Sequence, residues 1–179
     1  MRGARCPGDI GYAPTEAERR PAESAIIDVL LDNGLLIFSR EEMLEEKVIR
    51  CREGKKFETR YLRKGFNDKI SVIRILDSRR ENFKLGKAYE NKVDVINVIT
   101  APEIEMLIIF NEDKYMDFKK SGKKPSDYCK ENLKMSQVKS YDFVKEYFAN
   151  PDILVRAIEK YSEISKIRKG EFTLLDLLK

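Results

Sequence analysis

The chain has 179 residues, and its 35 Lys and Arg against 31 Asp and Glu give a formal net charge of +4. It contains no histidine, which excludes Ser-His-Asp and Cys-His catalysis and any metal site that needs imidazole ligands. The three widely spaced cysteines predict reduced thiols in a cytoplasmic protein, and the longest apolar run, 106–110, is too short to cross a membrane.

Residues 1–21 contain prolines and glycines without a periodic apolar pattern. We expect them to form an irregular leader, unless this segment is not the natural start of the protein. The pattern changes at residue 22, where apolar residues recur at helical spacing. This predicts a helix that ends at Asn33-Gly34, a pair suited to a left-handed helix end.

The next stretch predicts several short elements. Residues 35–38 favour an extended segment, and 39–47 favour a short helix opened by a capping box of Ser39 and Glu42. Residues 48–52 predict a short strand, and 57–64 a basic helix.

Two nearly continuous apolar runs, 69–76 and 93–100, predict strands of a parallel sheet that is covered on both faces. A charged helix at about 79–90 between them would complete a right-handed βαβ unit. The expected fold class is therefore α/β, with a small and mainly parallel sheet.

The remaining sequence predicts helices. Pro102 favours the first turn of a helix that ends near Gly122, and Ser126 is the expected N-cap of the next helix. Further helices are expected over 140–150, 151–167 and 172–179. We expect an α/β domain over 22–122 and a helical extension over 123–179 that packs on it.

Asp77 directly follows the first predicted strand, and Glu81 lies one helical turn further on. Functional groups collect beyond the carboxyl ends of parallel strands, and two carboxylates there could hold Mg²⁺ through oxygen. A second interpretation is that Asp77 caps the following helix. Glu103 and Glu105 follow the second strand; the helix dipole alone would favour them, but they extend from the same sheet edge.

Basic residues, interleaved with Tyr61 and Phe66, are concentrated in 50–69. Such a segment could bind a phosphate backbone, or it could be the solvated face of an amphipathic helix. The candidate nucleic-acid-binding residues are Arg50, Arg52, Lys55, Lys56, Arg60, Arg63 and Lys64.

The stretches 22–33, 72–81 and 97–110 together resemble the Toprim-like proteins of the RloB type, which are linked to prokaryotic restriction and phage-defence loci. The resemblance covers about residues 22–150 and rests on short motifs. It implies a Toprim-like sheet and Mg²⁺-dependent chemistry on nucleic acid.

In that family a glutamate of an E-G-x-x-E motif acts as acid or base, and a D-x-D motif binds Mg²⁺. Glu23 matches the second glutamate, whereas Arg19 stands at the position of the first. Asp77 matches the first aspartate, and Arg79 replaces the second, which would repel a cation.

The resemblance thus assigns catalysis to Glu23 and Asp77, and metal binding to Asp77, Glu81 and Glu105. It predicts Mg²⁺-dependent cleavage of a phosphodiester in DNA or RNA. The alternative is a module without catalytic activity that recruits a protein or nucleic-acid partner.

Overall fold

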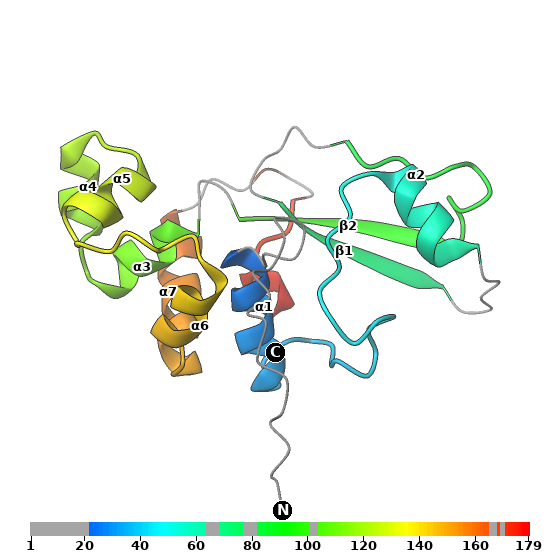
Figure 1. Cartoon of the computed structure of the whole chain (residues 1–179), viewed down its shortest axis with the longest axis horizontal. Helices are drawn as coiled ribbons and strands as arrows, with labels where there is room; N and C mark the ends of the chain where they lie inside the picture. The colour runs from blue at the N-terminus through cyan, green and yellow to red at the C-terminus, as the bar shows by residue number, and fades with distance from the viewer. Residues whose placement is uncertain (1–21, 64–68, 77–81, 101–103, 165–167, 169–170) are drawn as a thin grey trace, which may run out of the picture.

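The molecule has a helical half and a smaller half that is built on two strands (Figure 1). The computed structural model describes residues 22–63, 69–76, 82–100, 104–164, 168 and 171–179. Helix α1 (Ala22–Asp32) lies between the two halves. The expected mixed α/β class is confirmed, with a parallel sheet of two strands within the described part of the chain.

Helix α1 forms as predicted and is buried on nearly all sides, from Ser24 to Leu31. Its end also agrees with the prediction. The Leu35 N–H donates to the Leu30 carbonyl at 2.9 Å, and Gly34 adopts a φ of +64°. This pair of features is the Schellman helix end that a glycine permits without steric cost.

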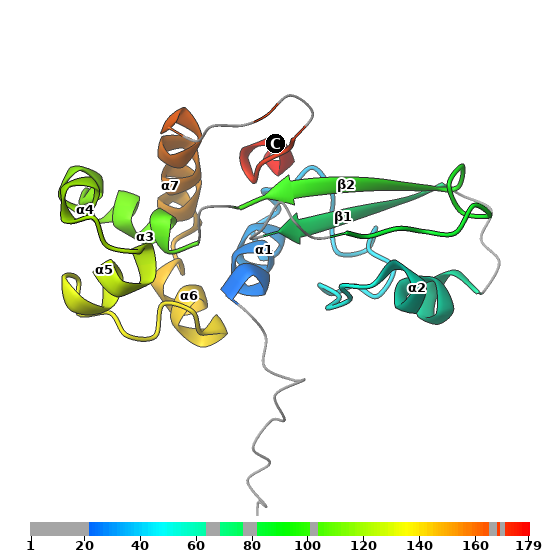
Figure 2. The same cartoon turned by 90° about the horizontal axis from the view of Figure 1, so that it is seen from above.

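Strands β1 (Ile70–Leu76) and β2 (Val93–Ile99) are parallel, in a register that runs from Ile70 beside Val93 to Leu76 beside Ile99. Alternate side chains serve two clusters: Val72 packs with Phe57, while Ile73 packs against the main core. The carboxyl ends of both strands point toward the helical half (Figure 2).

The connection between the strands contradicts the predicted helix at 79–90. Residues 82–92 form irregular structure and turns, and residues 79–81 lie outside the described chain. The apolar side chains Phe83, Leu85 and Tyr89 pack against the Phe57 cluster. Their spacing does not form the continuous apolar stripe that a helix needs, which explains the wrong prediction.

The predicted helix at 39–47 and strand at 48–52 are also absent: the first is a series of turns and the second is extended chain without a ladder in the described structure. The Ser39 N–H does donate to the Glu42 carboxylate at 2.7 Å, as in a capping box. However, Arg40 turns back to α1, and Glu46 has a φ of +52°, which is incompatible with continued helix.

The basic segment is helical, but it begins earlier than predicted. Helix α2 (Gly54–Phe57) continues directly into a π-helical turn, η1 (Glu58–Leu62). The buried side chains Phe57 and Leu62 anchor it to the sheet.

The single helix predicted from Pro102 to Gly122 is two helices, α3 (Glu105–Asn111) and α4 (Tyr115–Ser121), and Pro102 lies outside the described residues. Asp113 takes a φ of +52°, and the Lys114 N–H donates to the Ile109 carbonyl at 3.0 Å. This helix end interrupts the pattern because an aspartate tolerates the left-handed region. The predicted end at Gly122, with a φ of +64°, is confirmed.

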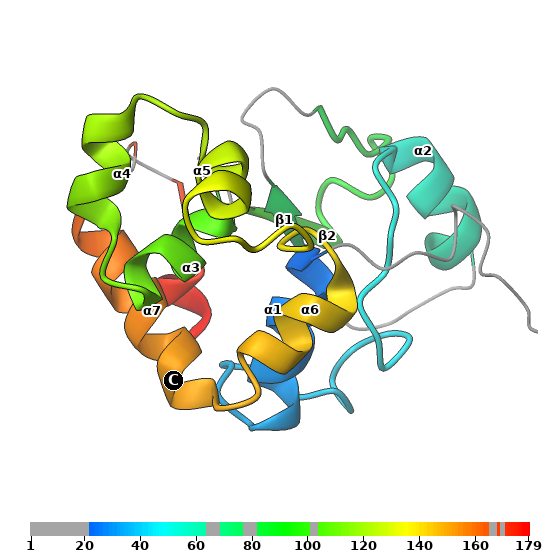
Figure 3. The ribbon, with the colours of Figure 1, turned by 60° about the vertical axis from the view of Figure 1, so that its left-hand side comes forward.

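Helices α5 (Pro125–Glu131), α6 (Tyr141–Tyr147) and α7 (Pro151–Ile164) complete the helical half. Ser126 is not an N-cap, because Pro125 occupies the first helical position and Lys124 precedes it. Helix α6 packs beside α1, and α3 packs against α5 and α7 (Figure 3).

The predicted helix at 172–179 is wrong except for a short 3-10 turn, η2 (Leu175–Leu177). Instead, the Ile99 N–H donates to the Phe172 carbonyl at 2.7 Å, which extends the sheet beside β2. Leu178 forms an antiparallel bridge with Leu36. Residues 172–178 therefore join the sheet to the chain that follows α1.

Candidate functional site

The carboxyl edge of the sheet is the predicted location of the acidic site. The Thr100 N–H donates to the Leu76 carbonyl at 2.8 Å, so the two strands run side by side to their ends. Asp77 follows Leu76 in the chain, but Asp77 and Glu81 lie outside the described residues, as does Glu103. Their roles as ligands, and that of Asp77 in catalysis, stay predictions.

Glu105 begins α3 and is buried within the described structure, with 4% of its side chain exposed. The Lys139 ammonium lies 3.1 Å from Glu105 Oε1. This contact does not have the geometry of a hydrogen bond, and Glu105 Oε1 accepts no hydrogen bond from the described residues. A carboxylate oxygen is the kind of ligand that Mg²⁺ prefers, at a distance of about 2.1 Å. This oxygen therefore suits a metal cation chemically, but it already lies beside the Lys139 ammonium.

Glu23 lies in the first turn of α1 and is half-buried. Within the described ranges, no group of three or more Asp, Glu or Cys side chains is arranged to hold a metal ion. A complete site would need Asp77 or Glu81.

The predicted nucleic-acid-binding residues do not share one helix. Arg50 and Arg52 lie on extended chain, Lys55 and Lys56 on α2, and Arg60 on η1. Lys64 lies outside the described residues. The candidates that the structure describes, from Arg50 to Arg63, all have exposed side chains.

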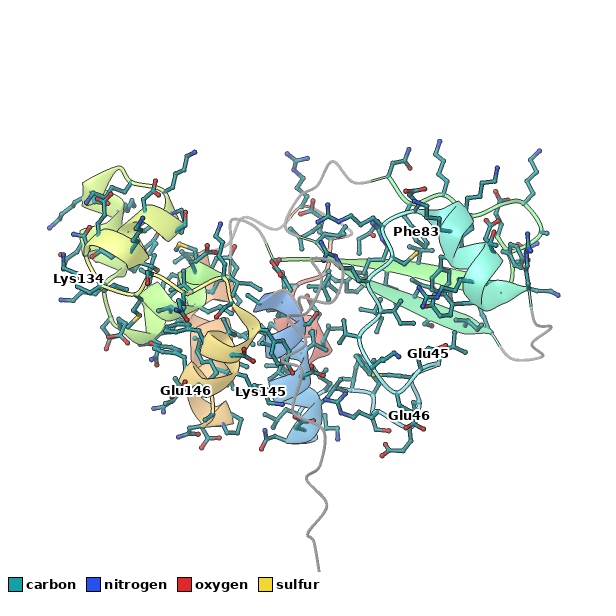
Figure 4. The ribbon with its side chains drawn as sticks, in the orientation of Figure 1. Glu45, Glu46, Phe83, Lys134, Lys145 and Glu146 are labelled. Atoms are coloured by element: carbon teal, nitrogen blue, oxygen red, sulfur yellow. The ribbon has the colours of Figure 1, made fainter. Side chains whose placement is uncertain are left out.

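The segment 83–92 brings further cations to the same part of the molecule. The Gly86 N–H donates to the Glu58 carboxylate, and Phe83 packs beside Phe57, with ring centroids 5.8 Å apart (Figure 4). We call 50–63 and 83–94 the basic lobe. It contains nine basic and four acidic residues, so it carries a net positive charge.

Sequence reasoning missed three cations of the basic lobe, because the chain between the two strands was expected to form a crossover helix at about 79–90. The signal was present in the run NFKLGKAYENK. The exposed residues concerned are Lys84, Lys87 and Lys92.

A second acidic cluster, on α1, was also missed. Asp28 is 4% exposed and accepts hydrogen bonds from Arg40 at 2.7 Å and from the Tyr141 hydroxyl at 2.8 Å. Asp32 accepts from Arg40 and Lys145, and Figure 4 shows Lys145 beside α1. The signal was an aspartate within the apolar run AIIDVLL.

The hydrogen bond from Arg40 holds the pKa of Asp32 below its ordinary value, against an opposing effect of partial burial. The same two aspartates raise the pKa of Arg40. Each described member of this cluster contacts an opposite charge or a hydroxyl group. The cluster therefore has a structural role: it connects α1 to α6 and to the chain at Arg40.

A shallow depression lies beside the end of β2, between α3, α7 and residues 173–175. Its lining is mostly apolar and includes no charged side chain among the described residues. The lining residues are Ile99, Thr100, Ile104, Leu107, Ile158, Tyr161, Ser162, Thr173, Leu174 and Leu175.

No helix within the described ranges has the length and apolar character needed to cross a membrane. Comparison of the chain with protein-family models, with curated proteins and with solved structures gave no match.

Proposed function

We propose that this protein cleaves a phosphodiester bond in DNA or RNA with the help of Mg²⁺ at the carboxyl edge of β1 and β2. The observation that carries the proposal is the parallel register that ends with Leu76 beside Ile99. Asp77 follows one strand, and the helix that begins at Glu105 follows the other. The premise that acids from two separate segments start from one sheet edge is thus supported.

Three carboxylates would hold the metal: Asp77, Glu81 and Glu105. The chemistry of Glu105 fits, because its buried Oε1 lacks a hydrogen bond from the described residues. A bound Mg²⁺ would supply Lewis acidity at the phosphate and a more acidic water. Glu23 is the proposed acid or base, and its position in the first turn of α1 leaves it partly accessible.

The basic lobe would hold the nucleic acid backbone. Its cations are exposed and come from two segments that pack together, which is more than one solvated helix face provides. Phosphate contacts of this kind position a nucleic acid without selecting its sequence. The resemblance to RloB-type proteins suggests prokaryotic phage defence as the setting for such an activity.

A second candidate is a binding module without catalytic activity. The observation that favours it is the ion pair between Lys139 and Glu105, which already neutralises the described carboxylate of the site. In this case the basic lobe would bind nucleic acid, and the acidic edge would have only a structural role.

Plasmid nicking separates the two candidates. We expect the wild type to nick supercoiled plasmid in the presence of Mg²⁺ or Mn²⁺, and EDTA to stop this nicking. The substitutions Asp77→Ala and Glu105→Gln should each abolish it. Asp117→Ala is the matched control, because Asp117 is an exposed acid on α4 in the helical half, outside the basic lobe. Absence of nicking by the wild type, with salt-sensitive retention of DNA in a gel-shift assay, would favour the binding module.

A further inference from the structure

The basic lobe contains a row of packed aromatic rings as well as cations. The centroid of the Tyr61 ring lies 5.2 Å from that of Phe57, which lies 5.8 Å from that of Phe83. The Arg74 guanidinium lies over the Phe83 ring, 4.6 Å from its centroid. Phe57 and Arg74 are buried, whereas Tyr61 is half-buried. The row is thus anchored by buried groups, and its Tyr61 end is partly open to solvent.

The local backbone holds Tyr61 in place. Tyr61 lies in the π-helical turn η1, and the side chains of Phe57 and Leu62 on the same helical segment are buried. Turns of this kind are uncommon and are often found at functional sites. A tyrosine ring supported in this way offers a large contact area and loses little conformational freedom when a ligand stacks on it.

Arg60 brings a positive charge to the same ring. Its guanidinium lies over the Tyr61 ring, 5.4 Å from the centroid, and the Arg60 side chain is exposed. The ring therefore already accepts a planar group from an exposed side chain. A nucleobase is also planar and can take this position, while Arg60 turns to the phosphate beside it.

The acids of the basic lobe leave most of its cations available for phosphate. Glu53 pairs with Lys56 at 2.6 Å, and Glu58 accepts a hydrogen bond from a backbone N–H of the segment 83–94. Asp94 pairs at 2.8 Å with Lys69, which lies outside the lobe. Lys56 is thus the one cation of the basic lobe that forms an ion pair with another described residue.

We propose that the basic lobe binds single-stranded nucleic acid, with a nucleobase stacked on Tyr61 and the neighbouring phosphates held by the exposed cations. Stacking on a protein ring needs an unstacked base, which a single strand offers and the interior of a duplex does not. Cations alone would bind both forms. The inference rests on the role of the basic lobe in the proposed function and names the form of nucleic acid that it takes. It does not depend on the metal ligands.

Fluorescence anisotropy in EDTA tests this without cleavage. The probes are end-labelled oligothymidylate and oligouridylate of about 15 nucleotides, and a DNA duplex of the same length. We expect the wild type to bind a single strand about tenfold more tightly than the duplex. The tighter of the two single strands identifies the preferred sugar.

Tyr61→Ala should weaken single-strand binding about 5- to 150-fold, which is the loss expected for one stacked base. Tyr61→Leu keeps an apolar contact with Phe57 but has no aromatic face, so it should show a similar loss while it melts close to the wild type. The slope of log affinity against log salt should not change in either variant, because no phosphate contact is removed.

Two control variants complete the comparison. Tyr61→Phe keeps the ring and should retain the single-strand affinity of the wild type. Tyr115→Ala also removes a ring that stacks on a phenylalanine, with centroids 4.8 Å apart, but on α4 in the helical half. It should leave binding unchanged.

Equal binding of single strand and duplex by the wild type would overturn the inference, and so would wild-type single-strand affinity in folded Tyr61→Leu. Neither result would bear on nicking at the acidic edge. Tyr61-dependent binding of a single strand without plasmid nicking would support the inference and remove the proposed cleavage. Absence of binding to every probe would overturn the inference together with the proposed role of the basic lobe.

Discussion

The Tyr141 hydroxyl donates a 2.8 Å hydrogen bond to the Asp28 carboxylate, across 113 positions of the sequence. Asp28 is buried in α1, and Tyr141 begins α6. The bond gives a buried acid a partner from the helix that packs beside it. It therefore ties the central helix to the helical half at a point where an unpaired charge would be costly.

Tyr141→Phe should destabilise the protein by roughly 1–3 kcal/mol, since it removes a hydrogen bond to a charged, buried acceptor. Urea denaturation followed by circular dichroism measures this loss. Tyr115→Phe is the matched control. The Tyr115 ring stacks on Phe110, and its hydroxyl forms no hydrogen bond with the described residues. Equal midpoints for the two variants would contradict the role of the Tyr141 hydroxyl.

The pH dependence of stability should depend on Asp32. Its pKa is lowered from 3.8 in the folded protein, chiefly by Arg40, so the folded state binds fewer protons than the unfolded state near this pH. The stabilisation is present above pH 3.8 and is lost as the pH falls through the lower folded-state pKa.

Asp32→Asn should flatten the fall in melting temperature in this acid range. Arg40→Met should flatten the same part of the curve, because it removes the main cause of the shift. Melting temperatures from about pH 6 down to about pH 3 provide the comparison. An unchanged acid slope in both variants would show that Asp32 does not contribute.

Gly54→Ala should disturb the basic lobe. A Cβ at Gly54 would lie too close to the Lys84 carbonyl oxygen, at 2.1 Å, and this oxygen is backbone and cannot move aside cheaply. We expect a loss of about 1–3 kcal/mol in the free energy of unfolding. The control is Gly86→Ala, whose Cβ would meet only the Glu58 side chain at 3.5 Å. A similar loss for both variants would mean that the close approach at Gly54 is not the cause.

Lys55→Ala with Lys56→Ala should weaken DNA binding and lower the slope of log affinity against log salt, by about 0.9 for each phosphate that is no longer neutralised. The matched control is Lys119→Ala with Lys120→Ala, an adjacent pair on α4 in the helical half. Fluorescence anisotropy at several salt concentrations measures both. Equal effects of the two double variants would show that the basic lobe has no special role in DNA binding.

The strands at 70–76 and 93–99 were predictable because their apolar runs are short and nearly continuous. Such runs suit strands whose alternate side chains pack against two different clusters, as they do here. The end of α1 was predictable from Gly34, since the required conformation is local. In these cases the local preference and the tertiary environment agree.

Other features depend on tertiary interactions that a local pattern does not contain. The Ser39–Glu42 bond forms as expected, yet no helix follows, because Arg40 is drawn to Asp28 on α1. The pairing of Glu105 with Lys139 joins residues 34 positions apart through an irregular turn, so no spacing rule could find it. The counter-charge of Glu105 therefore could not be predicted from the sequence.

The bridge between Leu36 and Leu178 has a consequence for how the protein folds during synthesis. The chain that follows α1 is synthesised early, but it cannot form this bridge until residues 172–178 have left the ribosome. Most of the described sequence is made between these two events. Until then the chain at 35–37 and the outer edge of β2 lack a partner that they have in the folded protein. Nascent chains should therefore need protection from aggregation until this late segment emerges.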